Sequence, residues 1–295
     1  MTREEAFEKT KQEIVGDNLT ITSALEADQL HDLFIKLRTE LFFREITEIM
    51  PHYRGEQNFG WDIRSGIFRP PLKIADPKVG KDLEQKAIQE FEQVIHDKVG
   101  AKTLRDLFNK EKHGKDWDLL FQAQHAGVKT TLTDWSAFII SALYFATEQS
   151  PNADIENDDG QLWCFIIPTI NILGHNDYPE RNTFYDINPF DVKNTFLINP
   201  SSYISEIEER IFEYRMYRQK GRFVMASNDT CHIPLNQQDH LKKYIFRARI
   251  PAEFKQKIRD ELANRGVTRE TMYIDETPSR QDLITEINTK IYSGY

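Results

Sequence analysis

The sequence predicts an α+β fold, with mixed or antiparallel small sheets and flanking helices. Segments with helical spacing and segments typical of strands follow one another without the regular strand–helix–strand alternation of a parallel sheet. The 295 residues are 39% hydrophobic and include 19 Phe and 11 Tyr, which is enough to bury one sizeable core. Two cysteines make no disulfide framework, and no run of about 18 apolar residues is present to cross a bilayer.

Residues 1–48 are predicted to form an N-terminal helical segment, because apolar residues recur at helical spacing over 2–14 and 24–46. Residues 51–71 are dense in Gly, Pro, Arg and aromatic residues, which indicates a strand end followed by an ordered loop. Helical spacing then predicts two further helices, at 81–98 and 104–121.

A strand-to-helix junction is predicted in the middle of the chain. Residues 129–133 are rich in β-branched side chains and indicate a short strand, whereas 137–146 is apolar on nearly every face and indicates a buried helix. Ser136 would be the N-cap of this helix, with Asp134 as the alternative, and Trp135 would pack on Ile140. The free N–H groups at such a junction also suit a phosphate, but taken alone this segment favours capping.

The second half of the chain continues the mixture of elements. Residues 150–160 are predicted to form an acidic loop, 161–168 a buried strand, and 169–188 a long irregular connection. Pro251 and Gly266 fit the start and the end of a helix. The remaining predicted elements are strands at 195–198, 221–226, 244–250 and 272–274, a helix at 203–219, and a C-terminal helical tail at 277–295 whose helix starts from Arg280.

The charge of the chain argues against generic attraction to nucleic acid, because the net charge is −9. A basic strip, which consists of Lys242, Lys243, Arg247 and Arg249, is interpreted either as a solvated face or as an RNA or phosphate contact. The charged N-terminus has no secretory pattern, so a cytoplasmic location and no membrane partner are expected. No metal site is expected either, because the acidic loop lacks the spacing of a calcium loop.

Four separated motifs then occur in a characteristic order. Tyr53-Arg54-Gly55 is followed by the run from Ser65 to Pro70, and a central signature runs from Gln124 to Ala146. The later motifs are Gln219-x-Gly221-x-Phe223 and a closing segment from Gly266 to Asp275. In this order and over about residues 50–276, the chain resembles the FRG domain family. The resemblance assigns residues 49–276 to an FRG domain.

The layout of FRG domains is similar to that of ADP-ribosyltransferases, and this similarity implies an ADP-ribosyltransferase-like fold with NAD as the substrate. Arg54, the step from Thr133 to Ser136, and the element that starts at Gln219 would be the counterparts of the three strand-borne motifs of those enzymes. Ribosyltransferases usually carry a Glu in the third motif, whereas this chain has Gln219. Either Asp134 or Glu56 supplies the carboxylate instead, or there is no catalysis.

The resemblance implies roles for individual side chains. Arg54 would grip a phosphate, with Gly55 letting the ligand approach, although Arg54 could instead be a buried residue paired with a carboxylate such as Asp134. Tyr53, His125 and Tyr144 could instead be core residues, and Asp134 and Ser136 could merely cap a helix. The implied catalytic residues are Arg54, Asp134 and Gln219. The implied NAD-binding residues are Tyr53 as a base stack, Arg54, Gly55, His125 on a ribose hydroxyl, Thr133, Ser136 and Tyr144.

The function implied by the resemblance is an NAD-dependent ADP-ribosyltransferase-like enzyme. Such an enzyme would be a toxin or effector in bacterial or phage conflict, including antiviral defence, that modifies a protein, RNA or DNA acceptor and is held by an antitoxin or inhibitor. Two alternatives stay open. One is a module that binds a nucleotide or a partner without catalysis, and the other is an NAD glycohydrolase.

Overall fold

A computed structural model describes residues 5, 19–42, 51–99, 112–166, 172–173, 184–198, 219–273 and 278–295. The predicted helix at 2–14, apart from Glu5, and the predicted helix at 203–219, apart from Gln219, lie outside these residues. So do the first part of the helix predicted at 104–121 and most of the connection predicted at 169–188. The fold is α+β, as the sequence predicts.

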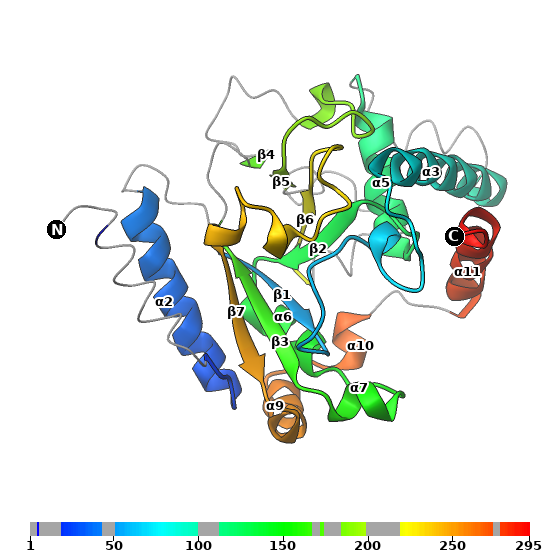
Figure 1. Cartoon of the computed structure of the whole chain (residues 1–295). Helices are drawn as coiled ribbons and strands as arrows, with labels where there is room; N and C mark the ends of the chain where they lie inside the picture. Colours follow the sequence, from blue (N-terminus) through cyan, green and yellow to red (C-terminus); the bar gives the residue numbers. More distant parts are fainter. Residues whose placement is uncertain are drawn as a thin grey trace.

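The described strands form one seven-stranded sheet rather than several small ones (Figure 1). Its order is β4-β5-β6-β2-β1-β3-β7, and all neighbours are antiparallel except β4 and β5. The prediction of separate sheets was therefore wrong for this part of the chain. The strands are β1 (His52–Glu56), β2 (Leu132–Ser136), β3 (Gly160–Phe165), β4 (Ile172–Leu173), β5 (Phe196–Ile198), β6 (Gly221–Met225) and β7 (Ile245–Ile250).

The larger helices pack in two groups. The helices α2 (Ala24–Phe42), α6 (Ile139–Thr147) and α9 (Ala252–Asn264) contact one another and share a core with β1, β3 and β7. The helices α3 (Pro77–Val99), α5 (Gly114–Ala126) and α11 (Pro278–Tyr292) contact one another and share a second core with β2, β5 and β6 (Figure 1). Two short helices, α7 (Ala153–Asn157) and α10 (Arg269–Met272), follow α6 and α9 in the chain.

The strand of the central junction lies three residues later than predicted. Thr131, within the predicted strand, donates its N–H to Glu84 on α3 at 2.5 Å instead of joining the sheet. The Asp134–Ser136 step, predicted to be a polar cap, is instead part of β2. The β-branched run was misleading because a buried carboxylate from a distant helix takes its backbone donor.

The start of α6 also differs from the prediction. Phe138 occupies the N-cap position, and the Ser136 Oγ accepts from the Phe138 N–H at 2.9 Å while it donates to the Gln219 carbonyl at 2.7 Å. Ser136 therefore ties β2 to the segment before β6. The proposed packing of Trp135 on Ile140 was wrong, since Trp135 packs against Phe165 in the other core.

Two smaller predictions were also wrong. Met272 belongs to α10 rather than to a strand, and the acidic loop after α6 contains the short helix α7. The prediction for α9 was confirmed to within two residues, because Pro251 precedes its first residue and Gly266, with a φ of +76°, lies two residues after its end. None of the helices within the described ranges is long and apolar enough to cross a membrane.

Candidate functional site

A cavity of about 530 Å³ lies beside the point where β1 and β2 separate. The two strands are in register at the single pair Tyr53–Ser136, whereas β1 pairs with β3 over five residues. The wall is completed by the loop after β1, the end of α5 and one face of α6. Its volume is within the range of about 300–1,000 Å³ that is usual for small-molecule sites.

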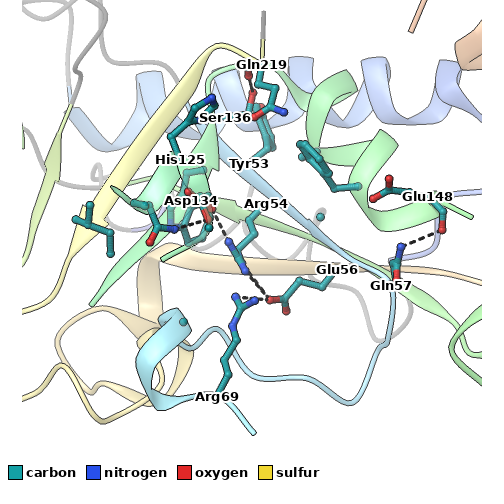
Figure 2. Close-up of a pocket in the computed structure, with 18 of the residues that line it drawn as sticks. Tyr53, Arg54, Glu56, Gln57, Arg69, His125, Asp134, Ser136, Glu148 and Gln219 are labelled. Atoms are coloured by element: carbon teal, nitrogen blue, oxygen red, sulfur yellow. Dashed lines mark hydrogen bonds and ion pairs between the residues drawn. The ribbon is translucent and has the colours of Figure 1, made fainter. Parts of the chain in front are cut away.

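Arg54 crosses the open part of the sheet (Figure 2). Its Nη1 donates to the backbone carbonyl of Asp134 on β2 at 2.7 Å, and its Nε and Nη2 donate to Oε1 of Glu56 at 3.0 and 2.9 Å. The guanidinium thus replaces the backbone hydrogen bonds that β1 and β2 do not make there. Arg54 lines the cavity and is buried against a carboxylate, although that carboxylate is Glu56 and not Asp134. Its role in gripping a phosphate stays a prediction.

Glu56 is the acceptor at the centre of this network. Its Oε1 also accepts from Nη2 of Arg69 at 3.3 Å, and its Oε2 accepts from Nε2 of Gln161 on β3 at 3.1 Å. Burial raises the pKa of Glu56 above its ordinary value, and the hydrogen bonds and positive charge of Arg54 oppose that rise. A carboxylate with so many donors is held in one orientation.

The raised pKa of Glu56 predicts a pH-dependent stability. A carboxyl whose pKa is higher in the folded chain stabilises the fold most below its ordinary pKa, and this contribution is lost as the pH rises through the folded value. We therefore expect the stability of the parent protein relative to Glu56→Gln to fall over the range from about pH 4, the ordinary pKa of a Glu side chain, up through the raised pKa of the folded chain. Urea unfolding of both proteins across this range measures the difference. A difference that is constant or that increases with pH would contradict the raised pKa.

Asp134 presents the exposed carboxylate of the cavity. Its Oδ2 accepts from Nε2 of Gln124 at 2.8 Å, and Oε1 of Gln124 accepts in turn from the Thr130 hydroxyl at 2.5 Å. The carboxylate is therefore oriented by a side chain from α5 while the Asp134 backbone is held by Arg54. Of the two carboxylates that the sequence offered in place of a late Glu, Asp134 is the one placed to touch a ligand.

Tyr53 and Gly55 point away from Arg54 and Glu56, as alternate residues of a strand do. The Tyr53 ring is fully buried, and its hydroxyl hydrogen-bonds Nδ1 of His31 on α2 at 2.6 Å. Tyr53 borders the cavity, but a ring with no exposed area favours the core interpretation over the base stack. A Cβ added at Gly55 would lie 1.8 Å from the Ala142 carbonyl oxygen, so this glycine, which also borders the cavity, is required for the close approach of helix α6.

Gln219 and His125 both line the cavity (Figure 2). Gln219 uses its side-chain amide to donate to the Met272 carbonyl at 2.8 Å, which ties the cavity to α10. His125 lies in the last turn of α5, just before Gly127 ends the helix in the left-handed region. Ser136 completes this wall through its bond to the Gln219 backbone.

Two predicted binding residues lie outside the cavity. The hydroxyl of Thr133 donates to the Val224 carbonyl at 3.2 Å and accepts from Nε1 of Trp135 at 3.0 Å, so it is a buried link to β6. The ring of Tyr144 packs against Tyr273, and it borders a separate cavity of about 440 Å³. Neither side chain is among those that line the site. Tyr144 has the core role that was its alternative.

Sequence reasoning missed several residues of the site. Arg69 was noted only as part of a motif, yet its side chain is 37% exposed and lines the cavity. Its Nε donates to the Arg64 carbonyl at 2.7 Å. Trp61 and Glu148 also line the wall. The position of Arg69 within the Arg-rich loop was the available signal, whereas nothing in the sequence indicated which of the other side chains face the cavity.

The basic strip is largely neutralised within the protein. Arg249 forms an ion pair with Asp159, Lys242 forms one with Asp239 at 2.6 Å, and the Arg247 guanidinium lies 3.9 Å from the centre of the Phe59 ring. This arrangement favours the solvated face over an RNA contact. In the ranges that the structure describes, no group of three or more His, Cys, Asp or Glu side chains could hold a metal ion.

Comparison with known proteins gives one match. The family model of the FRG domain matches residues 51–155, which include β1, the loop after it, α5, β2 and α6. No curated protein and no solved structure matches the chain. The matched range contains nearly all of the cavity wall, and Gln219 is the exception.

Proposed function

Because the chain carries an FRG domain over residues 51–155, we propose that the cavity between β1 and β2 binds NAD and that the protein transfers its ADP-ribose group to a protein or nucleic-acid acceptor. The observation that carries this proposal is the exposed carboxylate of Asp134, held in the cavity through its backbone by Arg54 and through its side chain by Gln124. A fixed negative charge is what the cleavage of the nicotinamide–ribose bond requires.

The chemistry has one bond to break and one to form. The bond between the nicotinamide nitrogen and the ribose anomeric carbon breaks, and its electron pair neutralises the nicotinamide ring as it leaves. The ribose develops positive charge, which the Asp134 carboxylate would stabilise across the cavity. A nucleophilic oxygen or nitrogen of the acceptor then bonds to the anomeric carbon and loses its proton.

Arg69 is better placed than Arg54 to bind the pyrophosphate. The donors of Arg54 already bond Glu56 and the Asp134 carbonyl, and Arg54 is only 8% exposed. Arg69 is more exposed, and its Nη1 makes no hydrogen bond to any part of the chain that the structure describes. We therefore assign the phosphate grip to Arg69, and we assign Arg54 the role of a positioning residue that holds β2.

The role of Asp134 predicts the effect of removing its charge. Asp134→Asn keeps an acceptor for Gln124 and lies at an exposed position, so the fold should be unaffected. We expect nicotinamide release from NAD to fall about 100-fold or more, as for other groups that stabilise charge in a transition state. Chromatographic detection of nicotinamide, with labelled NAD, cellular protein and RNA present as acceptors, measures the loss.

Asp97→Asn is the matched control, because Asp97 is exposed on α3 and lies away from the cavity. It should leave the rate unchanged. If the parent protein neither releases nicotinamide nor labels an acceptor, the enzymatic proposal is wrong. Release of nicotinamide with no labelled protein or RNA would instead identify a glycohydrolase.

A binding module without catalysis is the second candidate. Two observations favour it. The Arg54 guanidinium already donates to Glu56 and to the Asp134 carbonyl. Gln219 has an uncharged amide where a Glu is expected, and this amide donates to the Met272 carbonyl. This candidate predicts NAD binding by calorimetry with no cleavage. The role as a conflict effector predicts growth arrest on expression in bacteria, and Asp134→Asn should relieve the arrest only if catalysis causes it.

A further inference from the structure

Trp61 is an exposed tryptophan on the wall of the cavity. Its exposed fraction is 43%, whereas Trp117, Trp135 and Trp163 are 1%, 3% and 5% exposed. A large aromatic ring usually contributes its area to a core, so an exposed ring that lines a polar cavity calls for a ligand.

The loop that carries Trp61 is held at several points, so the exposure of the ring does not come from a loose segment. The Trp61 carbonyl accepts from Nε2 of Gln161 on β3 at 2.7 Å. The next side chain, Asp62, accepts from Asn236 at 2.9 Å and from Gln237 at 2.8 Å. These contacts involve the backbone of Trp61 and the side chain of its neighbour Asp62, and none of them involves the indole.

Phe59 shows that the packing of this loop does not depend on Trp61. The ring of Phe59 lies beneath the guanidinium groups of Arg247 and Arg249, at 3.9 and 5.5 Å from its centre. Its N–H donates to the Asp159 carbonyl at 2.6 Å. Phe59 therefore anchors the loop to β7 and β3, and the indole of Trp61 is available for another partner.

A cation lies in the same cavity wall. Arg69 contributes a partly exposed guanidinium that is oriented by the Arg64 carbonyl and by Glu56. An aromatic side chain and an oriented guanidinium that line one cavity match the two ends of a nucleotide, because the ring stacks a base and the cation binds a phosphate. An apolar ligand would use the indole but would leave this cation without a partner.

We propose that Trp61 is a stacking platform for a nucleobase, with the phosphate of the same nucleotide on Arg69. This inference rests on the proposed function in one respect, which is that the adenine of NAD is the base expected to stack on Trp61. A base of a nucleic-acid acceptor would stack in the same way. Trp61 touches the ligand and sets its orientation, and it takes no part in bond cleavage.

The test uses AMP, which carries a base and a phosphate but no nicotinamide to release. Since Trp61 is the exposed one of the four tryptophans, iodide quenching of tryptophan fluorescence reports mainly on this ring. We expect AMP to protect the parent protein from quenching. By calorimetry, Trp61→Ala should weaken AMP binding about tenfold or more, and Trp61→Phe should weaken it less because a ring remains.

Two controls separate stacking from other effects. Trp61→Leu keeps an apolar side chain without an aromatic face and should behave like Trp61→Ala. Ribose 5-phosphate, which has no base, should bind the parent and Trp61→Ala equally. Circular dichroism checks that the variants fold, as expected because the backbone of Trp61 and not its ring holds the loop.

Several outcomes would overturn the proposal. These are AMP binding that Trp61→Ala does not weaken, AMP binding that leaves quenching unchanged, or protection by neither AMP nor a single-stranded oligonucleotide. Protection by the oligonucleotide alone would support stacking and assign the base to the acceptor. AMP binding through Trp61 without nicotinamide release from NAD would support this platform while contradicting the proposed catalysis, so the two failures are distinguishable.

Discussion

Gly55→Ala is expected to prevent stable folding or to lower the free energy of unfolding by about 3 kcal/mol or more, at the upper end of overpacking costs. The added Cβ would lie 1.8 Å from the Ala142 carbonyl oxygen and 2.6 Å from the Ala146 nitrogen. Both atoms belong to the backbone of α6, so no side-chain rotation relieves the clash. The helix would have to move off β1, on which much of its packing depends. Urea unfolding measures the loss.

Gly294→Ala is the matched control, because a Cβ added there meets nothing within 4 Å. Its unfolding midpoint should stay close to that of the parent. A Gly55→Ala protein as stable as this control would show that α6 and β1 are not in the tight contact described above. The result does not depend on any activity, so it tests the fold separately from the proposed function.

The elements that the sequence predicts well are those whose signals are local. The helix α9 has a proline before its start and a left-handed glycine after its end, and β7 alternates buried and exposed residues. The position of β2 could not be predicted in the same way. Thr130 and Thr131 have the composition of a strand, but their hydroxyls bond Gln124 and Glu84, and Glu84 lies 47 residues away from Thr131.

The candidate site follows the same division. The order of the motifs predicted that Arg54, Asp134 and Gln219 share one site, and all three line the same cavity. This agreement concerns their positions and not their roles. The directions of Tyr53 and Gly55 follow from strand alternation once β1 is known, since they share one face and Arg54 and Glu56 share the other. Trp61 and Arg69 could not be assigned, because a loop has no period that indicates which side chains face a ligand.

The three residues of the Tyr-Arg-Gly motif therefore make three different structural contacts from one strand. Tyr53 joins β1 to α2 through His31, and Gly55 lets α6 approach. Arg54, on the opposite face, spans the gap in the sheet and holds the backbone of Asp134. All three residues border the cavity, and Arg54 is the one that holds the backbone of Asp134 there.

Removing Arg54 should be costly to the fold. Arg54→Met leaves the Glu56 carboxylate buried without its main partner, and we expect a loss of about 3–5 kcal/mol in the free energy of unfolding, as for other broken buried pairs. In Arg54→Met/Glu56→Leu the orphaned charge is also gone. The double variant should therefore lose less stability than the sum of the two single variants, by about 1–3 kcal/mol, in a urea-unfolding cycle.

Activity should not recover with stability in that double variant. The Asp134 carbonyl still lacks the Nη1 donor that holds it at 2.7 Å in the parent, so the carboxylate that we propose as catalytic is no longer positioned even though the buried charge has been removed. We expect nicotinamide release to stay as low as in Arg54→Met. Recovery of the rate along with stability would mean that Arg54 serves only to neutralise Glu56. Additive losses of stability would mean that the two residues are not coupled, against the geometry of their shared hydrogen bonds.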